Sequence, residues 1–188
     1  MKRFLLLGWL SLAAVAGAGV SQGVDPQTGL KNWTWRGEGV SVKIVQRLPD
    51  QTRGFFLGRG FSAVAADRIA TTCIMQTIFR NDGVRPVTYD LNDWRVIHRD
   101  VESGLLTREY WDRQWTSGGP SRAARIALRW SLLPSRQTFQ PGDYNWGMSS
   151  YALPPGSRFD LHIVVDVGGR RIEQDIPSIE CAIDRTEK

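Results

Sequence analysis

Few residues in this chain of 188 could carry acid–base or metal chemistry. Its two histidines are His98, in RVIHRD, and His162, in FDLHIVVDV, where Asp160 lies two positions earlier. On an extended strand Asp160 and His162 share a face, so the carboxylate could orient the imidazole as a catalytic base or metal ligand requires. The same pattern is typical of a solvated histidine on the polar face of a strand, which is the interpretation we favour.

Other polar groups give weaker signals. Copper binding would require Met75 and Met148 to converge with both histidines. The segment DLND, residues 90–93, could offer oxygens to calcium but lacks the glycine and distal glutamate of an EF-hand loop, so turn chemistry explains it better. The carboxylates that could form a glycosidase pair are Glu102, Glu109 and Asp112. We expect no cofactor and no metal, and we keep two alternatives: a secreted hydrolase using acidic residues, and a periplasmic metal-handling protein.

Aromatic residues are the more promising feature, since the chain contains eight tryptophans. An exposed indole offers a rigid apolar face that can stack on a sugar ring or anchor a protein interface. The pairs Trp33/Trp35 and Trp111/Trp115 lie in segments with weak core patterns. Each pair could therefore contact a partner, although packing in the core or along a sheet edge is the alternative.

The segment FQPGDYNWGM, residues 139–148, combines a turn with aromatic side chains. Pro141-Gly142 suits the central positions of a type II turn. One interpretation is a corner followed by a short strand, with Tyr144 and Trp146 packed inward or along an edge. The other is a loop that presents Tyr144, Trp146 and Tyr151 to a ligand, as loops at the ends of sandwiches often do.

The N-terminal segment, MKRFLLLGWLSLAAVAGAGV, has the organisation of a secretory signal peptide. Lys2 and Arg3 precede an apolar run, and Ala16-Gly17-Ala18 provides small residues before a cleavage site. The alternative is an uncleaved anchor, although a helix that spans a bilayer needs ~20 apolar residues. We predict a signal peptide over 1–18, no stable membrane anchor after cleavage, and a periplasmic or secreted protein.

The two cysteines, Cys73 and Cys181, are 108 positions apart. In an oxidising compartment such a pair is typical of one disulfide, and two thiols without supporting histidines make a weak metal site. We therefore predict a structural Cys73–Cys181 disulfide.

The charge of the chain is modest and dispersed. Loss of Lys2 and Arg3 would leave 22 basic and 19 acidic residues, a net charge of +3. Nucleic-acid binders usually gather their basic residues in a dense stripe, whereas these are scattered. We expect no nucleic-acid partner.

Alternation of apolar and polar residues dominates the remaining sequence. It is clearest in RFDLHIVVDV, residues 158–167, after which Gly168-Gly169 predicts a hairpin. It also predicts a strand over 124–134, with Trp130 on its core face, and another over 55–61. Several half-buried strands separated by turns favour an all-β fold, an antiparallel immunoglobulin-like β-sandwich with at most one or two short helices.

Two segments have helical spacing. Residues 62–69, SAVAADRI, predict one or two turns of helix. In 105–115, LLTREYWDRQW, aromatic and leucine side chains recur at i,i+4, which favours a short helix or ordered loop, with a hairpin as the alternative. We expect residues 19–35 to form a loosely ordered lead-in and 36–188 to form a single sandwich domain.

Together these features predict an exported, non-catalytic binding or accessory module that contacts a protein or a glycan through aromatic loop residues. Arginine hydrogen bonds would fix the orientation of the partner, with Arg129 or Arg158 as donor. The predicted binding residues are Trp111, Trp115, Tyr144, Trp146, Tyr151 and Arg158.

Overall fold

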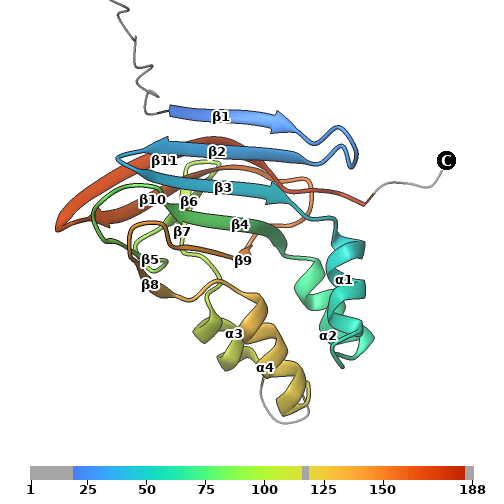
Figure 1. Ribbon diagram of the computed structural model, residues 1–188. Helices are drawn as coiled ribbons and strands as arrows, with labels where there is room; N and C mark the ends of the chain where they lie inside the picture. The colour runs from blue at the N-terminus through green and yellow to red at the C-terminus, as the bar shows by residue number, and fades with distance from the viewer. Residues whose placement is uncertain (1–18, 116–118, 185–188) are drawn as a thin grey trace, which may run out of the picture.

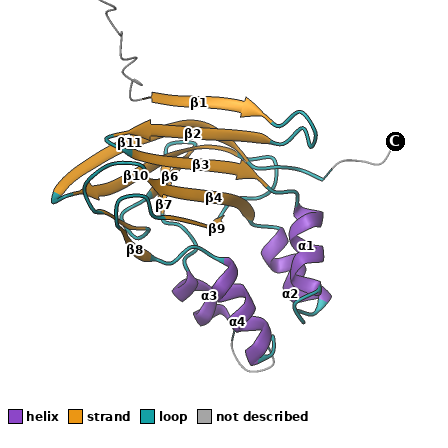
Figure 2. Ribbon diagram, viewed as in Figure 1, coloured by secondary structure: helices purple, strands orange, loops and turns teal. Residues whose placement is uncertain are grey.

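The computed structural model describes residues 19–115 and 119–184, so the signal peptide predicted over 1–18 lies outside the described residues. Strands form two antiparallel sheets that face each other, and helices gather at one side of them (Figures 1 and 2). The architecture is sandwich-like, as predicted. The immunoglobulin-like topology remains a prediction.

The first sheet has the order β1-β2-β3-β4-β9, in which four strands follow the chain and β9 is added at the edge. Its strands are β1 Gly19–Val24, β2 Lys31–Gly37, β3 Val40–Gln46, β4 Cys73–Asn81 and β9 Tyr144–Tyr151. The second sheet has the order β7-β6-β10-β5-β8, and β11 pairs with the other edge of β10. Its strands are β5 Val87–Asp90, β6 Arg95–His98, β7 Val101–Ser103, β8 Arg136–Phe139, β10 Arg158–Val167 and β11 Arg170–Glu180.

The main core lies between the sheets, where alternate side chains of each strand point inward. The strand predicted from RFDLHIVVDV is confirmed as β10, and its apolar residues from Phe159 to Val167 are buried. The hairpin is confirmed too, since Gly168 and Gly169 both adopt positive φ between β10 and β11. The disulfide between Cys73, which begins β4, and Cys181, which follows β11, joins the two sheets as predicted.

The N-terminal segment differs from the expected loose lead-in, because residues 19–35 include β1 and most of β2. Trp33 and Trp35 point from β2 into the core and are 1% and 2% exposed. Burial of two indoles holds β2 in the sheet, and β1 pairs along its free edge. These two tryptophans are therefore core residues.

In residues 19–115 and 119–184 the structure has four helices where the sequence predicts one or two: α1 Pro49–Leu57, α2 Ala63–Ala70, α3 Arg108–Gln114 and α4 Arg122–Ser131. The helical interpretations of 62–69 and 105–115 are confirmed as α2 and α3, with Ser62 and Thr107 as N-caps. The strands predicted over 55–61 and 124–134 are wrong, because most of the first segment lies in or just after α1 and most of the second in α4. Within the described residues, no helix has the length and apolar character needed to cross a bilayer.

Burial at i,i+4 explains why α4 is a helix. Ala124, Leu128 and Leu132 are buried, whereas Ile126 and Trp130 are 47% and 78% exposed. The same sequence alternates, but only the helical stripe finds an apolar surface to cover. That surface is a second core, which the helices form against Ile74 of β4 and Met148 of β9, on the face of the first sheet that points away from the main core.

The two helix pairs, α1/α2 and α3/α4, come from separate insertions, between β3 and β4 and between β7 and β8. Both lie on the same side of the molecule (Figure 1). Rings join them, since Phe61 and Trp115 have centroids 5.9 Å apart and Phe56 packs against Phe61 at 5.3 Å. This helical core fixes how far apart the two pairs stand.

Gly147 of β9 has no side chain, which allows the chain leaving α4 to lie close against the sheet. A Cβ at this position would lie 2.9 Å from the backbone nitrogen of Leu133 and 3.2 Å from the carbonyl carbon of Leu132. We expect Gly147→Ala to lower the free energy of unfolding by about 1–3 kcal/mol, as overpacking of a tight site does.

Gly54→Ala is the matched control for Gly147→Ala. Gly54 is exposed within α1 and has open space around its Cα, so alanine should stabilise the protein by about 0.5–1 kcal/mol through lower entropy of the unfolded chain. Urea unfolding of both variants measures whether the free energy of unfolding falls for Gly147→Ala and rises for Gly54→Ala. Equal effects would show that close backbone approach at Gly147 is unimportant.

Candidate binding groove

A groove of about 240 Å³ lies where the two helix pairs meet the outer face of the first sheet. One wall comes from Arg47 and from Phe55 and Arg59 at the end of α1, and the other from Trp130 and Ser131 at the end of α4. Gln76 of β4, together with Trp146 and Met148 of β9, forms its base. Each wall is therefore positioned by a different insertion.

Local structure explains why the two tryptophans meet. Tyr144, Trp146 and Met148 alternate along β9 and point away from the main core. The chain leaving α4 is fastened to the same strand, since the Leu133 amide donates to the Met148 carbonyl at 2.9 Å. The last turn of α4, with Trp130, is thus held close to Trp146.

Trp130 and Trp146 are 78% and 65% exposed although both border the groove. Tyr144, 61% exposed, stands two residues before Trp146 on the same face of β9. Large aromatic rings exposed in this way lose the free energy that burial would provide. A partner that covered them would recover it, which makes this surface a candidate for binding.

Two arginines give the groove a positive charge. The guanidinium carbons of Arg59 and Arg47 lie 3.2 and 5.4 Å from the centre of the Phe55 ring. Burial, with repulsion from Arg59, lowers the pKa of Arg47 below its ordinary value. The Nε of Arg47 is buried without a hydrogen-bond partner, and among the described residues neither arginine forms an ion pair with a carboxylate.

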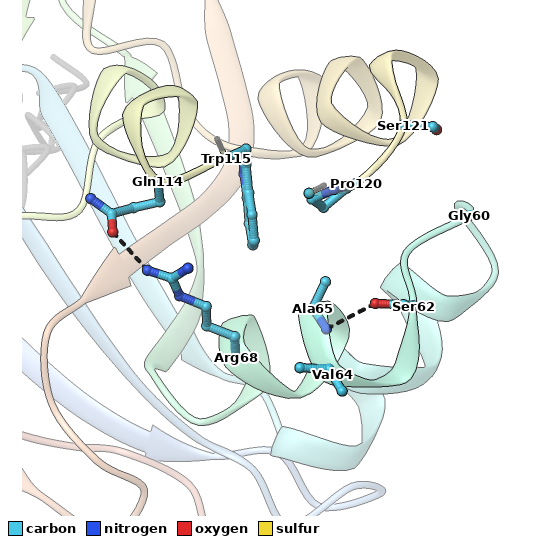
Figure 3. Close-up of a pocket in the computed structure, with 10 residues that line it drawn as sticks. Gly60, Ser62, Val64, Ala65, Arg68, Gln114, Trp115, Pro120 and Ser121 are labelled. Atoms are coloured by element: carbon cyan, nitrogen blue, oxygen red, sulfur yellow. Dashed lines mark hydrogen bonds between the residues drawn. The ribbon is translucent and has the colours of Figure 1, made fainter. Parts of the chain in front are cut away.

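A larger cavity of about 480 Å³ lies between α2 and the loop that joins α3 to α4. Figure 3 shows Arg68 reaching Gln114 across it, with a hydrogen bond of 2.6 Å, while Trp115 faces Ala65. The arginine of this larger cavity has a side-chain acceptor in Gln114, whereas in the groove Arg59 donates to the backbone carbonyl of Phe55 at 3.0 Å and the Arg47 Nε has no acceptor.

The predicted aromatic binding residues fall into two groups. Tyr144 and Trp146 are exposed and stand together. Trp111, Trp115 and Tyr151 are 2%, 8% and 0% exposed, so the expectation that they present aromatic faces to a partner is wrong. Trp111 and Trp115 stack at 5.6 Å in the helical core, and the Tyr151 hydroxyl lies 2.9 Å from Ser149 Oγ. Trp111 and Trp115 therefore belong to the helical core and Tyr151 to the main core.

Neither predicted arginine donor lines the groove. Arg158 pairs with Glu180 at 3.1 Å, and Arg129 pairs with Asp112 on the surface of α3 and α4. The residues that the sequence did not reveal are Arg47, Phe55, Arg59 and Trp130. Phe55 and Arg59 have i,i+4 spacing, a helical signal that the strand interpretation of this segment concealed.

The histidines lie apart from the groove and from each other. The Nδ1 of His98 lies 2.7 Å from the carbonyl oxygen of Arg158. The Nδ1 of His162 lies 2.7 Å from Asp175 on the neighbouring strand, whereas Asp160 accepts a hydrogen bond from the Ser178 amide. In the described part of the chain, no group of three or more His, Cys, Asp or Glu side chains is placed to hold a metal.

The carboxylates named as a possible catalytic pair are engaged in surface contacts. Glu109 and Asp112 both face Arg129, and Asp112 is about half exposed. Partial burial alone would raise the pKa of Glu109, but hydrogen bonds from Ser135 and Thr107 and the charge of Arg129 hold it below its ordinary value. A catalytic acid needs the opposite shift, so this pair does not favour a hydrolase. In the segment 90–93, the Asp90 carboxylate accepts hydrogen bonds from the backbone amide and the side-chain amide of Asn92. Such local hydrogen bonds are typical of a turn.

Comparisons with protein-family models, with curated proteins and with solved structures found no match to this chain. The groove must therefore be interpreted from its own chemistry.

Proposed function

We propose that this protein is an exported, non-catalytic binding module that contacts a glycan or a protein through the groove between α1, α4 and β9. The observation that carries the proposal is the pairing of two exposed indoles, Trp130 and Trp146, brought together from a helix and a strand far apart in sequence. Exposed tryptophans held on rigid elements are the usual anchors of binding surfaces, because they bury much apolar area at little cost in entropy.

Export is supported by the chemistry of the cysteines and the leader. The Cys73–Cys181 bond is typical of an oxidising compartment, and the chain begins with the pattern of a signal peptide. We propose the periplasm or the extracellular space as the place where the groove meets its partner.

Alanine substitution of each groove tryptophan tests the proposal. Wild-type protein, Trp130→Ala and Trp146→Ala would be applied to an immobilised glycan panel and used to capture partners from an extract of the exported compartment. We expect each substitution to weaken binding ~10- to 100-fold, the range for an anchor worth about 1.4–3 kcal/mol.

Ile126→Ala is the control for this experiment, because Ile126 is exposed on α4 but does not line the groove. Its binding should equal that of the wild type. A partner retained at full affinity by both tryptophan variants would contact another surface, and the proposal would then be wrong.

A further inference from the structure

The two arginines of the groove differ from the six arginines of the described chain that pair with carboxylates. Arg53, on the same helix as Phe55, contacts Asp50 and lies 2.9 Å from Asp67, and Arg80, Arg129, Arg158, Arg170 and Arg171 also pair with carboxylates. Arg47 and Arg59 instead approach the same ring from different segments, repel each other, and have no carboxylate partner among the described residues. Within residues 19–115 and 119–184, two like charges are thus held together without a carboxylate between them.

Such an arrangement is unfavourable in the unliganded protein. Burial of the Arg47 Nε without an acceptor adds a desolvation cost to the repulsion between the guanidinium groups. An anion between them would offset the repulsion, and a carboxylate suits the planar guanidinium fork, which can donate two parallel hydrogen bonds.

We infer that the ligand of the groove is an acidic glycan, with the carboxylate of a hexuronic acid unit between Arg47 and Arg59 and the sugar ring against Trp146 and Trp130. This inference rests on the proposed function and adds the chemical class of the ligand. Anionic charge and flat apolar faces are the two properties that the groove complements, and a uronic acid unit presents both.

The geometry favours a glycan over a peptide. The groove, at about 240 Å³, is smaller than the roughly 300–1,000 Å³ of most ligand pockets, which suits one ring at a time. An extended peptide commonly adds to a free sheet edge. From Met148 to Ser150 the edge of β9 that faces away from β4 is occupied, because the amides of Leu133 and Leu106 donate to the carbonyls of Met148 and Ser150. Tyr144 extends the row of aromatic rings along β9, where a neighbouring sugar unit would lie.

The experiment uses oligosaccharides of four units with and without charge. Calorimetric titration would compare tetramers of galacturonic, mannuronic and glucuronic acid with their methyl esters, which retain the rings and lose the charge. We expect at least one acidic tetramer to bind tenfold or more tightly than its ester. Arg47→Gln and Arg59→Gln should each weaken binding of that acidic tetramer ~10- to 100-fold, because charge-assisted hydrogen bonds contribute about 1.5–3 kcal/mol. Binding of the ester should change little.

Arg36→Gln is the matched control, since Arg36 is an exposed arginine of β2 outside the groove and its loss changes the net charge equally. It should bind like the wild type. Trp146→Ala should weaken binding of the acidic tetramer and of its ester to the same extent. If esters bind as well as acids and only Trp146→Ala matters, the inference is wrong but the proposed function stands.

Two other results would also overturn the inference. One is that no acidic tetramer binds, in which case capture of a partner that depends on Trp130 and Trp146 would still support the proposed function. The other is binding to phosphatidylglycerol vesicles that depends on both arginines while every sugar fails, which would assign the groove to a membrane surface.

Discussion

Replacing Cys73 and Cys181 by alanine is expected to lower the free energy of unfolding by about 4–5 kcal/mol, because the disulfide closes a loop of 108 residues. In the unfolded chain the bond restricts most of the structured sequence. In the folded protein it joins β4 to the end of β11, one from each sheet. A loss of this size is comparable to the whole stability of many domains, about 5–15 kcal/mol, so the variant should be only marginally folded.

Guanidinium unfolding of the double variant, and of the wild type with and without a reductant, measures this effect. The reduced wild type should match the variant, since both lose the same constraint. Alanine is preferred to serine because Cys73 and Cys181 are 3% and 1% exposed, and a buried hydroxyl would add its own cost. A loss below about 1 kcal/mol would show that the sheets need no covalent link and that the chain-entropy account does not apply here.

Trp94→Ala is expected to cost about 3–5 kcal/mol, the range for removal of a large buried ring. Trp94 is fully buried between the sheets, and its ring lies 5.8 Å from that of Tyr89. Its indole nitrogen donates to the carbonyl oxygen of Val164 at 2.9 Å. The substitution therefore leaves a cavity and also removes the partner of a buried acceptor on β10.

Trp130→Ala is the control for Trp94→Ala, because the chemical change is identical and the ring is 78% exposed. Its stability should stay within about 0.5 kcal/mol of the wild type, as for most surface substitutions. Thermal and urea unfolding of the two variants would measure the difference. A large loss for Trp130→Ala would mean that this ring supports the fold, and its exposure could not then be attributed to binding.

The sequence predicted the sheets better than the helices for a physical reason. In β10 five apolar residues recur with period two and all five are buried, so pattern and structure agree: Phe159, Leu161, Ile163, Val165 and Val167. In α4 the residues from Ala124 to Leu132 satisfy both a period of two and a stripe at i,i+4. Which of the two is realised depends on the second core, and that surface exists only after β4 and β9 have paired.

The binding site was predicted in part. Tyr144 and Trp146 were proposed on their own turn and strand, and the structure places both on the surface. Their partners could not be identified, because Phe55, Arg59 and Trp130 reach the groove through two helical insertions. Trp111 and Tyr151 show the converse error: their local sequences resemble exposed loops, but each meets a core supplied by distant parts of the chain.

The two helix pairs that carry the groove walls are joined by rings that do not line the groove. Phe61 packs between Phe56 of α1 and Trp115 at the end of α3, within the helical core. Exchanging one of these aromatics for a smaller or larger side chain would narrow or widen the opening while both sheets stayed as they are. Descendants of this protein could therefore change ligand preference through concealed positions, with every surface residue of the groove retained.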